Sequence, residues 1–156
     1  SRFQANKPAT LYFDEIRTPT YTDCLNRLFH QLLVNDLAGL YHAGGPRRMS
    51  LYQIAQLVNR VGGYNPDLLQ GCPRVEAGPM PPRAGNVALD SSRLATRLGH
   101  LPFDPWPLAG ELVPIDDRWH YDRPASEPHS TEELARVLYR NPRWASDQAG
   151  QTSLPR

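Results

Sequence analysis

Apolar residues recur at helical spacing in the first half of the chain. A first set, spaced three or four residues apart, consists of Leu25, Leu28, Phe29, Leu32 and Leu33. This spacing predicts a helix over about residues 22–35, with the Asp23 carboxylate in its first turn, where negative charge is favourable. A second set consists of Leu51, Ile54, Ala55, Val58 and Val61. It predicts a second helix, which Ser50 and Gln53 begin with a capping box and Gly62 ends.

Short apolar runs around these helices predict β-strands. Thr10–Phe13 is typical of a short strand, and Gly39–Ala43 of a buried one. Further strands are expected over Gly85–Leu89 and near Val75. Helix, strand and helix in this order over residues 22–61 predict a crossover unit that adds to a parallel sheet. We therefore expect an α/β fold with few short strands and roughly three to five helices, the parent sheet lying outside this chain.

The second half of the chain is less regular. A helix is expected over residues 92–98, capped by Asp90 or Ser91 and ended by a glycine. Residues 102–107 are rich in proline and predict a rigid turn, with a last helical piece over 108–113. Up to residue 113, this half therefore adds two short helical segments and little sheet.

A change of composition after residue 113 predicts a boundary there. Residues 1–113 would form one lobe, and residues 114–156 a C-terminal extension, polar and aromatic at first. Ser130 begins a second capping box, which predicts helix over 130–140. The polar end, residues 148–156, predicts disorder.

Composition limits the class of protein. With 156 residues, 40% of them hydrophobic, the chain can bury one modest core. A net charge of +1 gives no attraction to nucleic acid or to an acidic membrane surface, and no apolar run approaches the ~20 residues of a membrane span. Cys24 and Cys72 fit no metal spacing and are expected to be reduced thiols in a cytoplasmic protein, although a disulfide between them is an alternative. The chain begins at Ser1 without a signal-peptide core, which predicts part of a longer protein.

The loop that contains Arg83 has the clearest binding chemistry. It places one arginine between Pro82 and Gly85, ahead of an apolar run and an Asp/Ser helix start. A guanidinium group on such a loop can grip a diphosphate or a carboxylate at two points.

Three segments together resemble the C-terminal, substrate-binding part of the extended short-chain dehydrogenase/reductase family, specifically its dTDP-4-dehydrorhamnose reductase group. They are residues 14–23, residues 39–45 and residues 83–99. The resemblance covers roughly residues 11–113. It implies a lobe that closes over an NDP-sugar, dTDP- or UDP-linked, beside NAD or NADP held by a Rossmann-type N-terminal half of the same protein.

The resemblance also implies roles for individual residues. Arg83 would reach the nucleotide diphosphate. Independently of the resemblance, Asn86 in the same loop could orient Arg83. The loop from Arg17 would lie near the sugar and nicotinamide, with Thr20 and Tyr21 lining the sugar end. Ala84 departs from the family's commoner Arg-Pro form.

The catalytic chemistry of that family is missing from the chain. Its reductases use a Tyr-x-x-x-Lys pair, in which the lysine lowers the pKa of the tyrosine. Lys7 is the only lysine here, and Phe3 stands four residues before it. A glycine-rich turn for a pyrophosphate is also lacking, because Gly44-Gly45 has no later glycine. The chain alone is therefore not expected to catalyse a reduction.

Each candidate residue has a structural alternative. Arg83 could be a surface charge that merely caps a carbonyl. Arg17 could pair with Asp14 or Glu15 in its own loop. Thr20 and Tyr21 could be packing residues, and Asn86 could satisfy the loop backbone.

Other polar residues favour structural roles. Asp23 is expected to act at a helix terminus, and His42 to be a satisfied core histidine. The histidines show no metal-ligand spacing. Trp119-His120-Tyr121 is either a packing patch or a partner surface.

Three functions follow from these observations. The first is the sugar-nucleotide-binding part of an NAD(P)-dependent sugar-nucleotide reductase, epimerase or dehydratase. The second is a non-catalytic regulatory or binding subunit that retains the same fold. The third is an interaction domain with a vestigial pocket. The oligomeric state is left open, a homo-oligomer included.

Overall fold

The computed structural model describes residues 2–79, 81–82 and 84–144 and shows an α/β arrangement of short elements. The strands are β1 (Ala9–Tyr12), β2 (Ile16–Arg17), β3 (Met49–Ser50) and β4 (Leu69–Cys72). The α-helices are α1 (Thr22–Leu33), α2 (Leu51–Val61), α3 (Ser92–Leu98) and α4 (Thr131–Leu134), which Ala135–Tyr139 continues as a π-helical turn. Single 3₁₀ turns are Pro66–Leu68, Arg74–Ala77 and Gly110–Leu112. Within the described residues, no helix is both long and apolar enough to cross a membrane.

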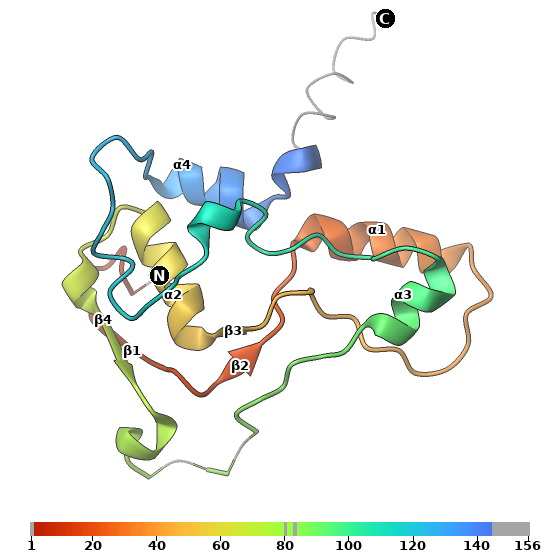
Figure 1. The fold of residues 1–156 in the computed structure, drawn as a ribbon, viewed down its shortest axis with the longest axis horizontal. Helices are drawn as coiled ribbons and strands as arrows, with labels where there is room; N and C mark the ends of the chain where they lie inside the picture. Colours follow the sequence, from red (N-terminus) through yellow and green to blue (C-terminus); the bar gives the residue numbers. More distant parts are fainter. Residues whose placement is uncertain (1, 80, 83, 145–156) are drawn as a thin grey trace, which may run out of the picture.

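The strands form two separate two-stranded sheets (Figure 1). β1 and β4 are parallel, with Ala9 opposite Leu69. β2 and β3 are antiparallel, with Ile16 opposite Ser50. Ile16 also forms an isolated parallel bridge with Asn86, which brings the later loop alongside β2.

The two long helices begin and end close to their predicted limits. α1 buries Cys24 and Leu28. α2 begins with the predicted capping box, because the Ser50 hydroxyl accepts from the Gln53 amide while the Gln53 side chain accepts from the Ser50 amide. α2 is buried on more than its apolar stripe, since Gln56, Asn59 and Arg60 are buried as well.

Replacing Ser50 with alanine should lower the free energy of unfolding by about 1 kcal/mol, because the Gln53 amide at the start of α2 loses its side-chain acceptor. Urea unfolding of Ser50→Ala measures this. The exposed Ser126 gives a matched control, and Ser126→Ala should change stability by less than about 0.5 kcal/mol. Equal effects of the two substitutions would show that the cap contributes nothing.

The predicted strand over Gly39–Ala43 is wrong for this chain. The segment has no strand neighbour among the described residues, Leu40 is 78% exposed, and His42 is exposed rather than a core histidine. A strand needs a partner for its backbone amides and carbonyls, so an apolar run alone does not form one. The crossover unit built on this strand is accordingly not seen.

Two other strand predictions also need correction. The strand expected near Val75 is β4, several residues earlier, because Pro73 precedes a 3₁₀ turn in which Val75 is 85% exposed. Over residues 85–89 only the bridge at Asn86 forms, since β2 offers just two residues for pairing.

The helix over residues 92–98 is confirmed as α3. It begins with the Asp90 carboxylate accepting from the Ser92 amide, and it ends at Gly99, whose φ of 75° is left-handed. Ser91 has the N-cap position, but its hydroxyl is hydrogen-bonded to Gly44 instead.

The C-terminal part packs on the same core as the rest. The predicted helix starts at Ser130, whose hydroxyl accepts from the Glu133 amide. A single cluster of buried side chains joins both sides of the predicted boundary after residue 113: Tyr21, Cys24, Leu28, Met49, Leu57, Val61, Leu94, Phe103, Trp106, Trp119, Leu134, Val137 and Leu138. Trp119 and His120 are buried, which favours the packing alternative for that patch. The boundary itself stays a prediction, and the predicted disorder over 148–156 lies outside the described residues.

Candidate functional site

The candidate site is a cavity of about 510 Å³ between three chain segments that are far apart in the sequence. Thr18 follows β2, residues 44–48 precede β3, and residues 86–92 lead into α3. The turn at residues 101–103 completes the wall. Pairing of β2 with β3, and the Ile16–Asn86 bridge, hold these segments side by side.

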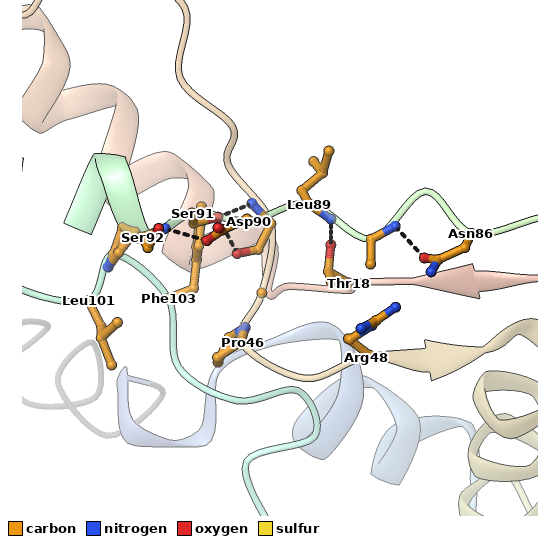
Figure 2. Close-up of a pocket in the computed structure, with 14 residues that line it drawn as sticks. Thr18, Pro46, Arg48, Asn86, Leu89, Asp90, Ser91, Ser92, Leu101 and Phe103 are labelled. Carbon is orange, nitrogen blue, oxygen red and sulfur yellow. Dashed lines mark hydrogen bonds between the residues drawn. The ribbon is translucent and has the colours of Figure 1, made fainter. Parts of the chain in front are cut away.

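Hydrogen bonds fix the floor of the cavity. The Ser91 hydroxyl accepts from the Gly44 amide at 2.8 Å and donates to its carbonyl at 2.9 Å. The Thr18 hydroxyl accepts from the Leu89 amide at 3.3 Å, and the Thr18 carbonyl accepts from the Gly45 amide at 3.0 Å (Figure 2). Thr18 and Ser91 thus join the three segments through hydrogen bonds to backbone groups.

Gly44 and Gly45 are needed for the close approach of these segments. A Cβ at Gly44 would lie 2.4 Å from the Thr18 hydroxyl oxygen, and one at Gly45 only 1.9 Å from the Pro19 carbonyl oxygen. Both positions are therefore filled by protein atoms.

The two ends of the cavity differ in chemistry. Figure 2 shows Arg48 and Asn86 toward one end, and Leu101 and Phe103 toward the other. The exposed Arg48 guanidinium offers several donors to an anion. Hydrogen bonds from Ser92 hold the pKa of Asp90 below its ordinary value, so this carboxylate is ionised at neutral pH. The arrangement suits an amphipathic ligand with an anionic group at the Arg48 end.

Of the sequence-predicted site residues that the structure describes, one lines this cavity. Asn86 does so, and its side-chain oxygen accepts from the Ala88 amide at 3.1 Å, as the loop-backbone alternative predicted. Arg83 lies outside the described residues.

Arg17 holds the loops instead of lining the cavity. Its guanidinium donates to the Ile16 carbonyl at 2.9 Å and the Gly85 carbonyl at 3.2 Å, and lies 3.4 Å from a Glu15 carboxylate oxygen. The pairing with Glu15 is therefore present, and Arg17 anchors the loop before Asn86 to β2.

Thr20 and Tyr21 are also away from the cavity wall. Tyr21 is 1% exposed, and its hydroxyl donates to the Val137 carbonyl and accepts from the Leu108 amide. Burial raises the pKa of this phenol. The Thr20 hydroxyl is buried too. We therefore leave both residues out of the proposed binding set.

Sequence reasoning missed Thr18, Ser91 and Arg48. Ser91 was taken for a helix cap, and its position also fits that role. Arg48 had a visible signal, since Arg47-Arg48 follows directly on the Gly-Gly-Pro loop. Arg47 does not line the cavity; its guanidinium donates to the Pro107 carbonyl.

The described residues do not fit a dinucleotide cofactor. Gly44 and Gly45 face Thr18, Leu89 and Pro19 rather than an open cradle, and α3 follows the cavity without a glycine-rich turn. The part of the chain that the structure describes also holds no cluster of three metal-ligating side chains.

The fold is similar to part of a known enzyme structure. It aligns with dTDP-4-dehydrorhamnose reductase from Bacillus anthracis str. Ames, solved in complex with NADP, at a TM-score of 0.58 and 20% sequence identity. The alignment covers 67% of this chain and 37% of that enzyme, so the chain spans well under two thirds of its length. No protein-family model matches the chain, and a search of curated proteins finds no match. The likeness shows a shared α/β fold.

Proposed function

We propose that this chain is the sugar-nucleotide-binding part of an NAD(P)-dependent sugar-nucleotide reductase, similar to dTDP-4-dehydrorhamnose reductase, or of a related epimerase or dehydratase. The observation that carries the proposal is the cavity with Arg48 and Asn86 at one end and an apolar wall at the other, in a fold shared with that reductase. Its volume lies within the range of small-molecule sites.

Each end of the cavity would bind a different part of the ligand. Arg48, with the Asn86 amide, would hold the diphosphate oxygens through charge-assisted hydrogen bonds. The apolar wall at Leu101 and Phe103 would pack against the base or the sugar ring. The diphosphate role of Arg83 stays a prediction from the family resemblance.

The redox step would take place on a separate Rossmann portion. This chain has no Tyr-x-x-x-Lys pair, so that portion would supply the proton donor and hold NAD or NADP. The present residues would position the sugar nucleotide. Two features support docking to such a portion: the segment Gly39–Ala43, which pairs with no strand among the described residues, and the two-stranded parallel sheet of β1 and β4, because parallel sheets are normally larger and covered on both faces.

A non-catalytic binding subunit with the same fold is the second candidate. The absence of the tyrosine–lysine pair favours it, and co-purification of a larger polypeptide that lacks its own sugar-nucleotide pocket would distinguish it from the first.

A series of ligands tests the proposed specificity for sugar nucleotides. Saturation-transfer NMR should show binding of dTDP-glucose or UDP-glucose to the 156-residue chain, weaker binding of the free nucleotide, and none of glucose. NADP should not displace the sugar nucleotide. Displacement by NADP, or binding of none of these ligands, would contradict the proposal.

Replacing Arg48 with glutamine should weaken sugar-nucleotide binding about tenfold, which corresponds to the loss of one charge-assisted hydrogen bond. Isothermal titration with dTDP-glucose measures the change. Arg97→Gln is the matched control, because Arg97 is exposed on α3 and does not line the cavity. Equal affinities of the two variants would remove Arg48 from the site.

A further inference from the structure

Residues 116–120, here called the strap, are bound along α2 by three side chains spaced one helical turn apart. The Tyr52 hydroxyl donates to the Asp117 carbonyl, the Gln56 amide to the Asp116 carbonyl and the Arg60 guanidinium to the Trp119 carbonyl, each at 2.9 Å. Positions four residues apart lie on one face of a helix, so these side chains form a row. The strap is therefore held mainly through its backbone carbonyls.

One side chain of the strap, His120, also contacts α2. It is 3% exposed, and its Nδ1 lies 3.1 Å from the side-chain nitrogen of Gln56, which is itself buried. A carbonyl oxygen only accepts hydrogen bonds, so the bond to Asp116 fixes the Gln56 amide with its NH₂ group toward the strap. The second hydrogen of that group then points at His120 Nδ1, which must carry a lone pair.

This arrangement admits only the neutral imidazole with its proton on Nε2. A proton on Nδ1 would face the N–H of Gln56. Turning the Gln56 amide over would instead place its oxygen against the Asp116 carbonyl. Either way, protonation of His120 breaks one of the bonds that join the strap to α2.

The surroundings of the imidazole favour its neutral form. Aromatic rings from α2 and from the strap's end pack on it, those of Tyr52 and Tyr121. Burial is the strongest influence and lowers the pKa of His120, and Arg118 acts in the same direction. Three groups oppose the lowering: the Pro66 carbonyl and the carboxylates of Asp116 and Asp67.

We propose that the strap is an acid-released latch, in which protonation of His120 frees residues 116–120 from α2. Release would remove one wall of the cavity of about 230 Å³ that Ile16, Tyr52, Gln56 and the strap residue Asp116 line. Because the neutral form is the bound one, the strap is fully closed above the ordinary histidine pKa of about 6.5. Its closed-to-open ratio then falls by up to about tenfold per pH unit as the pH drops toward the lowered pKa.

Amide hydrogen exchange on the full chain tests the latch. Between pH 7.5 and 5.5, after correction for intrinsic exchange, protection of the Trp119 and Tyr121 amides should fall by up to about tenfold per pH unit below about 6.5. Protection within α1 should stay constant. His120→Gln, whose side-chain oxygen can still accept from Gln56, should remove this pH dependence, whereas His42→Gln, at an exposed position, should keep it.

A second measurement does not need the His120→Gln variant, so it remains possible if that variant fails to fold. In the unmodified chain, the ¹⁵N chemical shifts of the His120 ring should show the Nε2–H form at pH 7.5. As the pH falls, they should titrate with a pKa below the ordinary histidine value. Strap protection that does not change with pH, pH dependence retained in His120→Gln, or a His120 pKa at or above about 6.5 would each overturn the latch.

Discussion

Replacing Arg60 with methionine should lower the free energy of unfolding by about 3–5 kcal/mol, because it leaves the Glu127 carboxylate without its partner in a largely buried site. The Arg60 and Glu127 side chains are 9% and 19% exposed, and they meet through bonds of 2.6 and 2.9 Å. The same guanidinium lies 4.1 Å above the centre of the Trp119 ring. One side chain thus supports α2, the strap and the loop before α4.

Urea unfolding of Arg60→Met measures this loss, and the chain offers a matched control. Arg136 pairs with Glu133 on the surface, where its own side chain is 62% exposed, so Arg136→Met should change stability by no more than about 1 kcal/mol. The double variant Arg60→Met/Glu127→Leu should recover part of the loss, because it removes the unpaired charge. A loss in Arg60→Met no larger than in Arg136→Met would show that the buried pair is not a main support of the fold.

Replacing Gly45 with alanine should have the second large effect, on both stability and binding. The added methyl group would lie 1.9 Å from the Pro19 carbonyl oxygen and 3.0 Å from its carbon, both backbone atoms that cannot turn away. The segments around Thr18 and Gly45 must then separate, which loses their shared hydrogen bond. We expect a destabilisation of about 1–3 kcal/mol, typical of overpacking, and sugar-nucleotide binding at least about tenfold weaker.

Gly110→Ala is the control for this substitution. A Cβ at Gly110 meets no atom within 4 Å, so this variant should unfold and bind like the original chain. Unfolding in urea and titration with dTDP-glucose compare the two variants. If Gly45→Ala matches Gly110→Ala in both measurements, the close approach does not shape the cavity.

The helices could be predicted from the sequence because their signals are local. The capping box at Ser50 and the one-sided hydroxyl cap at Ser130 satisfy amides within three residues, and Gly99 ends α3 through its own φ angle. The strands could not be predicted as well, because pairing depends on a distant partner. Gly39–Ala43 has the composition of a strand and finds no neighbour in the described chain.

The candidate site depends on contacts between distant segments, and this limited what the sequence could show. Tyr21 stands in a loop that resembles a substrate loop, but the carbonyl of Val137, 116 positions later, accepts from its hydroxyl. The Arg17 guanidinium likewise donates a hydrogen bond to the carbonyl of the distant Gly85. The row of Tyr52, Gln56 and Arg60 lies beside the apolar stripe of α2, and nothing local indicates that a later segment binds to it.

The central claim is that the cavity between Thr18, Gly44 and Ser91 holds a sugar nucleotide. A titration of the ¹⁵N-labelled chain with dTDP-glucose, followed by backbone amide shifts, tests it most directly and also detects weak binding. We predict saturable shifts concentrated at Thr18, Gly44–Gly45 and residues 86–92, greatly reduced in Arg48→Gln. Saturable shifts confined to other surfaces, or no shifts at the highest soluble ligand concentration, would contradict the account.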